Sequence, residues 1–236
     1  MFALLVPLLL LAAVTPAPAS RGERLYATHC ASCHAAERWG TPDGPSLRGA
    51  GAASLDFYLM TGRMPAAVPW LQIEHRDERI GQQLPLEDIR ALEAYLAPTV
   101  AGGPPLPRVI AGSDLRHGRQ LYALNCEHCH AASGNGGALG KLAWVPSLKR
   151  ASIDVVADAI RTGPGEMPRF SEQQLSQADL DDVAAYVMRM QAGEQPGVVP
   201  PFRSTGPVPE GAVAYLAVIV LVAFVFTFWR TEGGKT

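Results

Sequence analysis

The sequence predicts an all-α protein with two similar helical units in tandem, followed by one membrane-spanning helix. Three observations predict this class. Residues 211–229 form an apolar run without a charged side chain. Two earlier segments repeat the same residues in the same order, and each ends in apolar residues at helical spacing. The 20 prolines and 23 glycines of the chain punctuate its middle, which argues against one compact core.

The N-terminal segment predicts export from the cytoplasm. Residues 2–14 are almost entirely apolar, and the small residues that follow end at Ala19. A short apolar run before small residues is typical of a secretory signal peptide, and it is too short to span a bilayer comfortably. We therefore expect residues 1–19 to be a signal peptide, with a retained N-terminal anchor as the alternative.

The two units are recognised by an internal repeat. Six residues of the first unit recur 96 positions later, and further matches follow in the same order. Such self-similarity indicates duplication, with unit one at residues 20–97 and unit two at residues 113–191. The six pairs are Gly22/Gly118, Leu25/Leu121, Tyr26/Tyr122, Cys30/Cys126, Cys33/Cys129 and His34/His130.

Each unit is expected to contain an opening helix, a short middle helix and a longer last helix. Ser176 followed by Asp179 is a capping signal, which predicts that the last helix of unit two begins near Gln177. Insertions at residues 66–83 and 134–140 are expected in surface loops. The proline-rich segments 98–112 and 192–210 are predicted to be semi-extended linkers.

The apolar run at residues 211–229 is long enough to cross a membrane. As a helix it would extend roughly 28 Å, which is close to the thickness of a bilayer core. Arg230 and Lys235 follow it, and positive charge marks the cytoplasmic side. The prediction is a single-pass plasma membrane protein whose tail, residues 230–236, is cytoplasmic and whose two units are extracytoplasmic.

Charge excludes one class of partner. The net charge is −2, and acidic and basic side chains are evenly mixed in both units. A nucleic-acid-binding protein needs a basic surface, so we expect no nucleic acid partner.

All four cysteines lie in two C-x-x-C-H motifs, at Cys30, Cys33 and His34 and at Cys126, Cys129 and His130. This motif is the signature of covalent c-type haem attachment, in which the thiols hold the haem and the histidine binds the iron. A four-cysteine zinc site and thiol redox pairs also use C-x-x-C, but neither requires the histidines. The prediction is two covalently bound haem c groups per chain.

Each iron then needs a second axial ligand. Met64 and Met167, each followed by proline, occupy the same position in the repeat and are the predicted ligands. Core packing is the interpretation preferred for Met60, Met188 and Met190. Four histidines without a repeated counterpart, His29, His75, His117 and His128, are expected to be surface or structural groups. The carbonyls of Pro45 and Pro146 are candidates to accept the N–H of the proximal imidazoles, with a simple turn as the alternative.

Two C-x-x-C-H units, each with a downstream Met-Pro, and one C-terminal span resemble the dihaem cytochrome c subunit of actinobacterial cytochrome bc complexes. The strings Thr61-Gly62-Arg63-Met64-Pro65 and Met167-Pro168-Arg169-Phe170-Ser171 are the most specific parts of this resemblance. It implies two tandem cytochrome c domains in a quinol–cytochrome c oxidoreductase, whose quinone chemistry resides in partner subunits. The implied partners are a cytochrome b subunit, a Rieske iron–sulfur subunit that donates electrons, and a terminal oxidase that receives them.

Other function classes remain open from the residues alone. A free-standing, membrane-tethered dihaem carrier would need the same haem ligands. A cytochrome c subunit of a haem-copper oxidase commonly places its span before the haem domains, whereas the strong span here follows them. A zinc-stapled structural module is the non-redox alternative.

Overall fold

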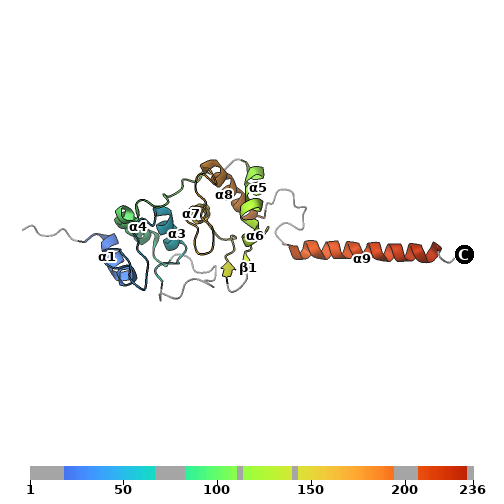
Figure 1. Cartoon of the computed structure of the whole chain (residues 1–236), viewed down its shortest axis with the longest axis horizontal. Helices are drawn as coiled ribbons and strands as arrows, with labels where there is room; N and C mark the ends of the chain where they lie inside the picture. Colours follow the sequence, from blue (N-terminus) through green and yellow to red (C-terminus); the bar gives the residue numbers. More distant parts are fainter. Residues whose placement is uncertain (1–18, 67–82, 111–113, 140–142, 194–206, 233–236) are drawn as a thin grey trace, which may run out of the picture.

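The computed structural model describes residues 19–66, 83–110, 114–139, 143–193 and 207–232. In these ranges the chain forms nine helices and one two-stranded sheet (Figure 1). The predicted all-α class is confirmed. The predicted signal peptide, apart from Ala19, and most of the insertion at 66–83 and of the linker at 192–210 lie outside the described residues.

Unit one is built on two long helices that cross. Helix α1 (Arg21–His29) begins at Ser20, whose side chain accepts a hydrogen bond from the Glu23 N–H. Helix α4 (Leu86–Val100) continues through Pro98, past the linker boundary expected at Ala97. The one-turn helix α2 (Ala31–His34) and helix α3 (Ala52–Met60) lie between them in the sequence.

Unit two repeats this arrangement. Its helices are α5 (Leu115–Asn125), α6 (Glu127–His130), α7 (Ile153–Thr162) and α8 (Gln177–Gln191). Helix α8 begins at the predicted residue, because the Ser176 and Asp179 side chains each accept a hydrogen bond from the other's backbone N–H. The core of each unit gathers between its long helices around a buried tyrosine, Tyr26 or Tyr122.

The glycine-rich stretch of unit two forms more than a loop. Strands β1 (Gly137–Leu139) and β2 (Ala143–Val145) pair antiparallel, with Ala138 opposite Trp144. Each strand has only three residues, so alternation of apolar and polar residues cannot reveal it in the sequence.

The two units contact each other through their middle helices, with α3 packed on α7 (Figure 1). The segment between the units is held at both ends. The Pro104 carbonyl accepts a hydrogen bond from the Ala53 N–H of α3 at 3.1 Å, and the Arg108 carbonyl accepts one from the Gln177 side chain of α8 at 2.8 Å.

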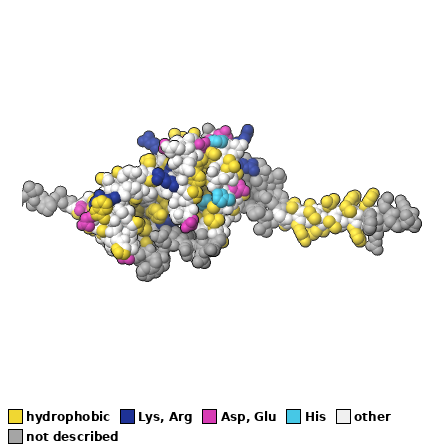
Figure 2. Space-filling model, viewed as in Figure 1, with side chains coloured by type: hydrophobic (Ala, Val, Ile, Leu, Met, Phe, Trp, Pro, Cys, Tyr) yellow, Lys and Arg dark blue, Asp and Glu magenta, His cyan; other side chains and the backbone are white. Residues whose placement is uncertain are grey.

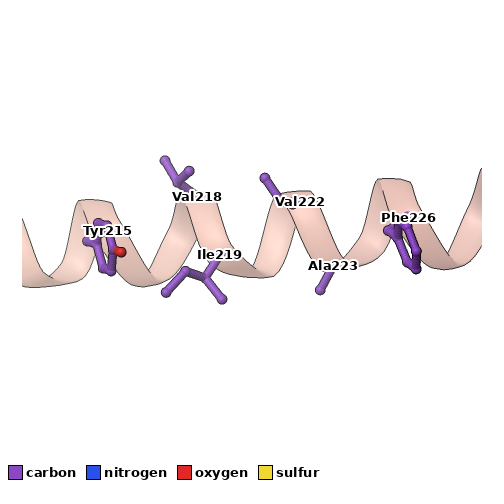
Figure 3. A pocket seen from close by; sticks show the side chains of 6 residues that line it. All are labelled: Tyr215, Val218, Ile219, Val222, Ala223 and Phe226. Atoms are coloured by element: carbon purple, nitrogen blue, oxygen red, sulfur yellow. The ribbon is translucent and has the colours of Figure 1, made fainter.

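Helix α9 (Pro207–Glu232) extends away from the two units, and hydrophobic side chains cover its described surface (Figures 1 and 2). Gly211–Phe228 has a mean hydropathy of 2.6, and none of it is buried in the protein. It is a candidate membrane span. Side chains at helical spacing line a groove along one face of this helix (Figure 3): Tyr215, Val218, Ile219, Val222, Ala223 and Phe226.

Candidate functional site

The first C-x-x-C-H motif forms a tight turn at the end of α1. Cys30 ends α1 and precedes α2, and its carbonyl accepts hydrogen bonds from the N–H groups of Cys33 and His34. The His34 side chain is buried, with 7% of the residue exposed. Its Nδ1–H donates to the Pro45 carbonyl at 2.7 Å, which leaves Nε2 as the nitrogen available to a metal.

The second motif has the same geometry. The Cys126 carbonyl accepts hydrogen bonds from the N–H groups of Cys129 and His130, and Nδ1 of His130 donates to the Pro146 carbonyl at 3.2 Å. Burial lowers the pKa of His130, although the Pro146 carbonyl acts in the opposite direction. The contact predicted for Pro45 and Pro146 is therefore present in both units, and each imidazole is fixed in one tautomer.

A tyrosine on the helix before each motif donates a hydrogen bond to the backbone that follows the motif. The Tyr26 hydroxyl donates to the Ala35 carbonyl at 2.6 Å, and the Tyr122 hydroxyl donates to the Ala131 carbonyl at 2.7 Å. Both alanines have a positive φ, 63° and 64°, which turns the chain sharply after the histidine. Burial raises the pKa of Tyr26 to about 12, so the hydroxyl keeps its proton and remains a donor.

The paired tyrosines also join the long helices. The rings of Tyr26 and Tyr95 lie 6.0 Å apart, and those of Tyr122 and Tyr186 lie 5.4 Å apart. These are contacts between the first and last helices of each unit.

Met64 and Met167 take equivalent positions on the loop after the middle helix. Each is partly buried against the core of its unit. The Met64 N–H donates to the Tyr58 carbonyl at 3.0 Å, and the Met167 N–H donates to the Pro164 carbonyl at 3.1 Å. Met60, Met188 and Met190 pack with the cores, as their sequence positions predict.

The described histidines without a repeated counterpart have surface roles. His29 and His128 are exposed. The Nδ1 atom of His117 on α5 lies 3.1 Å from Oδ2 of Asp182 on α8, so this contact links the two helices. His75 lies outside the described residues.

The surroundings of the cysteines differ from those of a redox-active thiol. Within the described ranges, no three or more His, Cys, Asp or Glu side chains are grouped as ligands of one metal ion. Burial raises the pKa of Cys30 and of Cys126 to about 11, and the neighbouring cysteine adds to this rise. Reactive redox thiols show the opposite shift.

One residue of the site was missed in the sequence because the repeat does not preserve it. Arg38 lies over the rings of Tyr26 and Tyr95 and donates a hydrogen bond to the Tyr95 hydroxyl. Its Nε is buried and has no hydrogen-bond partner among the described residues. The repeat places Gly134 at the corresponding position of unit two, where the end of Met190 occupies the space beside the glycine.

Two helical units, each with a C-x-x-C-H turn whose imidazole is anchored by a proline carbonyl, define a c-type cytochrome with tandem domains. Comparison with known families agrees. Residues 19–99 match the cytochrome c family, and residues 113–187 match the family described as cytochrome c oxidase, cbb3-type, subunit III. Cytochrome c domains carry covalently bound haem c and transfer electrons.

Relatives that span most of the chain identify its family. The chain is 37% identical over 204 residues to the cytochrome bc1 complex cytochrome c subunit of Mycobacterium leprae (strain TN), covering 83% of this chain and 69% of the relative. The subunit of the same name from Corynebacterium diphtheriae is 32% identical over 222 residues, 86% of this chain and 77% of the relative. Cytochrome c6 of Cyanidium caldarium is 34% identical over 83 residues, 34% of this chain and 74% of the relative. The chain belongs to the family of cytochrome c subunits of the cytochrome bc1 complex.

Proposed function

We propose that this chain is a fixed electron-transfer link in a quinol-oxidising cytochrome bc complex. It accepts electrons from a Rieske iron–sulfur subunit, lies beside a cytochrome b subunit, and passes electrons toward a terminal oxidase. The observation that carries this proposal is the pairing of two C-x-x-C-H units with one apolar C-terminal helix on a chain whose relatives are bc1 subunits. Quinone chemistry belongs to the partner subunits.

Each unit is proposed to hold one covalent haem c. In unit one the haem is bonded to Cys30 and Cys33, with His34 and Met64 as axial ligands. In unit two the corresponding residues are Cys126, Cys129, His130 and Met167. The haem supplies reversible one-electron chemistry at its iron.

The residues present fit this cofactor. The proline-anchored imidazoles leave one nitrogen for the iron, and the four thiols are not joined in disulfides. The unpartnered Arg38 Nε offers a donor to an anionic group, such as a haem propionate. With Met64 and Met167 as the second axial ligands, neither iron would retain an open site for oxygen or substrate.

The two units are proposed to lie on the extracytoplasmic face of the plasma membrane, where c-type haem is attached. The predicted signal peptide and the positive charges after the span both favour this topology. The apolar helix confines both haem units to the membrane surface, where a mobile iron–sulfur domain operates. A soluble shuttle would need neither the span nor the second unit.

Copurification tests the proposal. Membranes are solubilised mildly, and the chain is captured through a C-terminal tag, with an untagged strain as the control. We expect a cytochrome b and an iron–sulfur subunit in the eluate, together with quinol–cytochrome c reductase activity. A dihaem protein recovered alone, without quinol activity, would instead identify a free-standing tethered carrier.

A further inference from the structure

The contact between the two units buries two acidic side chains against each other. Small residues allow α3 and α7 to approach closely, since Ala53 and Ala157 are fully buried. Asp56 on α3 is 3% exposed, and Asp158 on α7 is 1% exposed. The two carboxyl groups lie close enough across the interface for each to shift the pKa of the other. Two ionised carboxylates could not share this position, because burial without compensation is costly for each charge.

Unit one supplies a cation to only one of the two aspartates. Arg90 on α4 donates to Asp56 at 2.7 Å and, through the same nitrogen, to Glu93 at 2.6 Å. Asp158 has no such partner, and its Oδ2 is buried without a hydrogen bond among the described residues. One proton placed between the two carboxyl groups would give this oxygen a partner, with Asp56 as the ionised acceptor and Asp158 as the protonated donor.

The electrostatic surroundings agree with this assignment. Burial raises the pKa of Asp158 well above its usual range, and the neighbouring carboxyl group of Asp56 raises it further. Burial raises the pKa of Asp56, but its interactions with Glu93, Asp158 and Arg90 together bring that pKa below its ordinary value. The other charged groups that act on the pair are Glu93 and Arg90 on α4 and Asp154 on α7. Arg161, three residues after Asp158 on α7, interacts instead with Glu172, Asp179 and Asp181. Arg63, after α3, lies over the Phe57 ring.

Among the described helices and strands, α3 and α7 form the main contact between the two units. The connection is attached to α3 through Pro104 and to α8 through Arg108, which leaves a short strap over residues 105–107. Such a strap keeps the units at high mutual concentration but does not set their orientation. The α3–α7 interface must therefore determine how far apart the two haem groups lie.

We propose that Asp56 and Asp158 are positioning residues that dock the two units through one shared proton and thereby set electron transfer between them. The consequence for electron transfer rests on the proposed presence of haem in both units, whereas the docking itself does not. Docking would take up a proton that a separated Asp158 releases above about pH 4. The docking constant should then fall by up to about tenfold per pH unit until the docked pKa of Asp158 is passed.

Hydrogen exchange on the full-length holoprotein in detergent tests the docking. Protection of α3 and α7 is measured between about pH 5 and about pH 9. Helix α5 of the same sample serves as the reference, which cancels the intrinsic effect of pH. We expect the relative protection of α3 and α7 in the wild-type protein to fall as the pH rises. Relative protection that is independent of pH would overturn the proposal without recourse to any variant.

Two matched substitutions separate the shared proton from a general effect of charge. Asp158→Asn keeps a neutral donor toward Asp56, so α3 and α7 should stay protected at high pH. Asp154→Asn removes the same charge from an exposed position of α7. It leaves the proton of Asp158 in place and should keep the downward slope of the wild-type profile. Two results would show that the proton does not dock the units. In the first, the protection of α3 and α7 in Asp158→Asn falls with pH as it does in the wild type. In the second, this protection is already lost at low pH while the haem spectra are intact.

Electron equilibration between the haems after photoreduction gives a second measurement on the same samples. The rate should decline with rising pH in the wild type and in Asp154→Asn but stay level in Asp158→Asn, because electron tunnelling weakens steeply with distance. A level rate in the wild type would contradict the link between docking and transfer. Absence of a second haem would overturn the proposed function instead and would leave the exchange result standing.

Discussion

Gly22 in α1 lies directly against Tyr95 in α4, so that a Cβ built on the glycine would be 2.6 Å from the Tyr95 Cβ. The Ala91 carbonyl would be closer still, at 2.2 Å. Unit two repeats this contact, with Gly118 against the Asp182 carbonyl and Tyr186. The first pair of the sequence repeat, Gly22 and Gly118, therefore marks the helix crossing on which each haem motif is built.

Replacing Gly22 by valine should destabilise unit one, because the added side chain meets backbone atoms that cannot move independently. Overpacking of this kind costs about 1–3 kcal/mol. Thermal unfolding followed by the haem absorption of unit one should show a lower midpoint. Ala27→Val, on the exposed side of the same helix, is the matched control and should cost about 0.5 kcal/mol. Equal midpoints in the two variants would contradict the close crossing.

Much of the fold could be predicted from local signals. The cap formed by Ser176 and Asp179 predicted the start of α8. The hairpin at β1 and β2 could not be predicted, because strands of three residues in a glycine-rich stretch carry no periodicity. The course of α4 through Pro98 was also missed, since proline usually disfavours a continuing helix.

The candidate site divides in the same way. The cysteines, the histidines and the anchoring prolines lie at fixed spacing, so the turn that unites them could be anticipated from the sequence. The role of Arg38 could not be anticipated from the sequence, because Arg38 has no counterpart in the repeat. The roles of Asp56 and Asp158 could not be anticipated from the sequence either, because these residues become buried only where α3 of one unit packs against α7 of the other. The assignment of the axial methionines remains a prediction.

The purified chain should contain two c-type haems. Each pair of thiols is expected to bond the two vinyl groups of one haem, so a pyridine haemochrome spectrum should report two haems per chain. The double variants Cys30→Ala/Cys33→Ala and Cys126→Ala/Cys129→Ala should each retain one. A wild-type chain with a single haem, or one with zinc instead, would be inconsistent with the assignment.

Met64→His and Met167→His should each keep a low-spin haem and lower its reduction potential, because bis-histidine ligation favours the oxidised iron relative to His/Met ligation. The weak charge-transfer band of methionine-ligated ferric haem should decrease by about half in each single variant, since one of two such haems is changed. Met60→Leu is the control for unit one and should leave the band intact. An unchanged band in Met64→His would transfer the role of ligand to Met60.

Arg161→Met should loosen the loop that carries Met167. Arg161 is buried and donates hydrogen bonds to the carbonyls of Leu175, at 2.7 Å, and of Phe170 and Ser176. Leaving these carbonyls without a donor should cost about 3 kcal/mol. The unfolding midpoint of unit two should drop and its methionine band should weaken. Arg150→Met, at an exposed position, should change neither measurement.

The orientation of the chain can be tested by proteolysis of intact cells that carry a C-terminal tag. The signal peptide predicted at residues 1–19 places the proline-rich linker 192–210 outside the cell, whereas Arg230 and Lys235 favour retention of the tail inside. An added protease should therefore release both haem units and leave a membrane fragment with its tag, and the tag should be lost only after the cells are permeabilised. Loss of the tag from intact cells would place the tail outside. The haem units would then face the cytoplasm, away from the side on which c-type haem is attached, so both the topology and the proposed electron path would have to be abandoned.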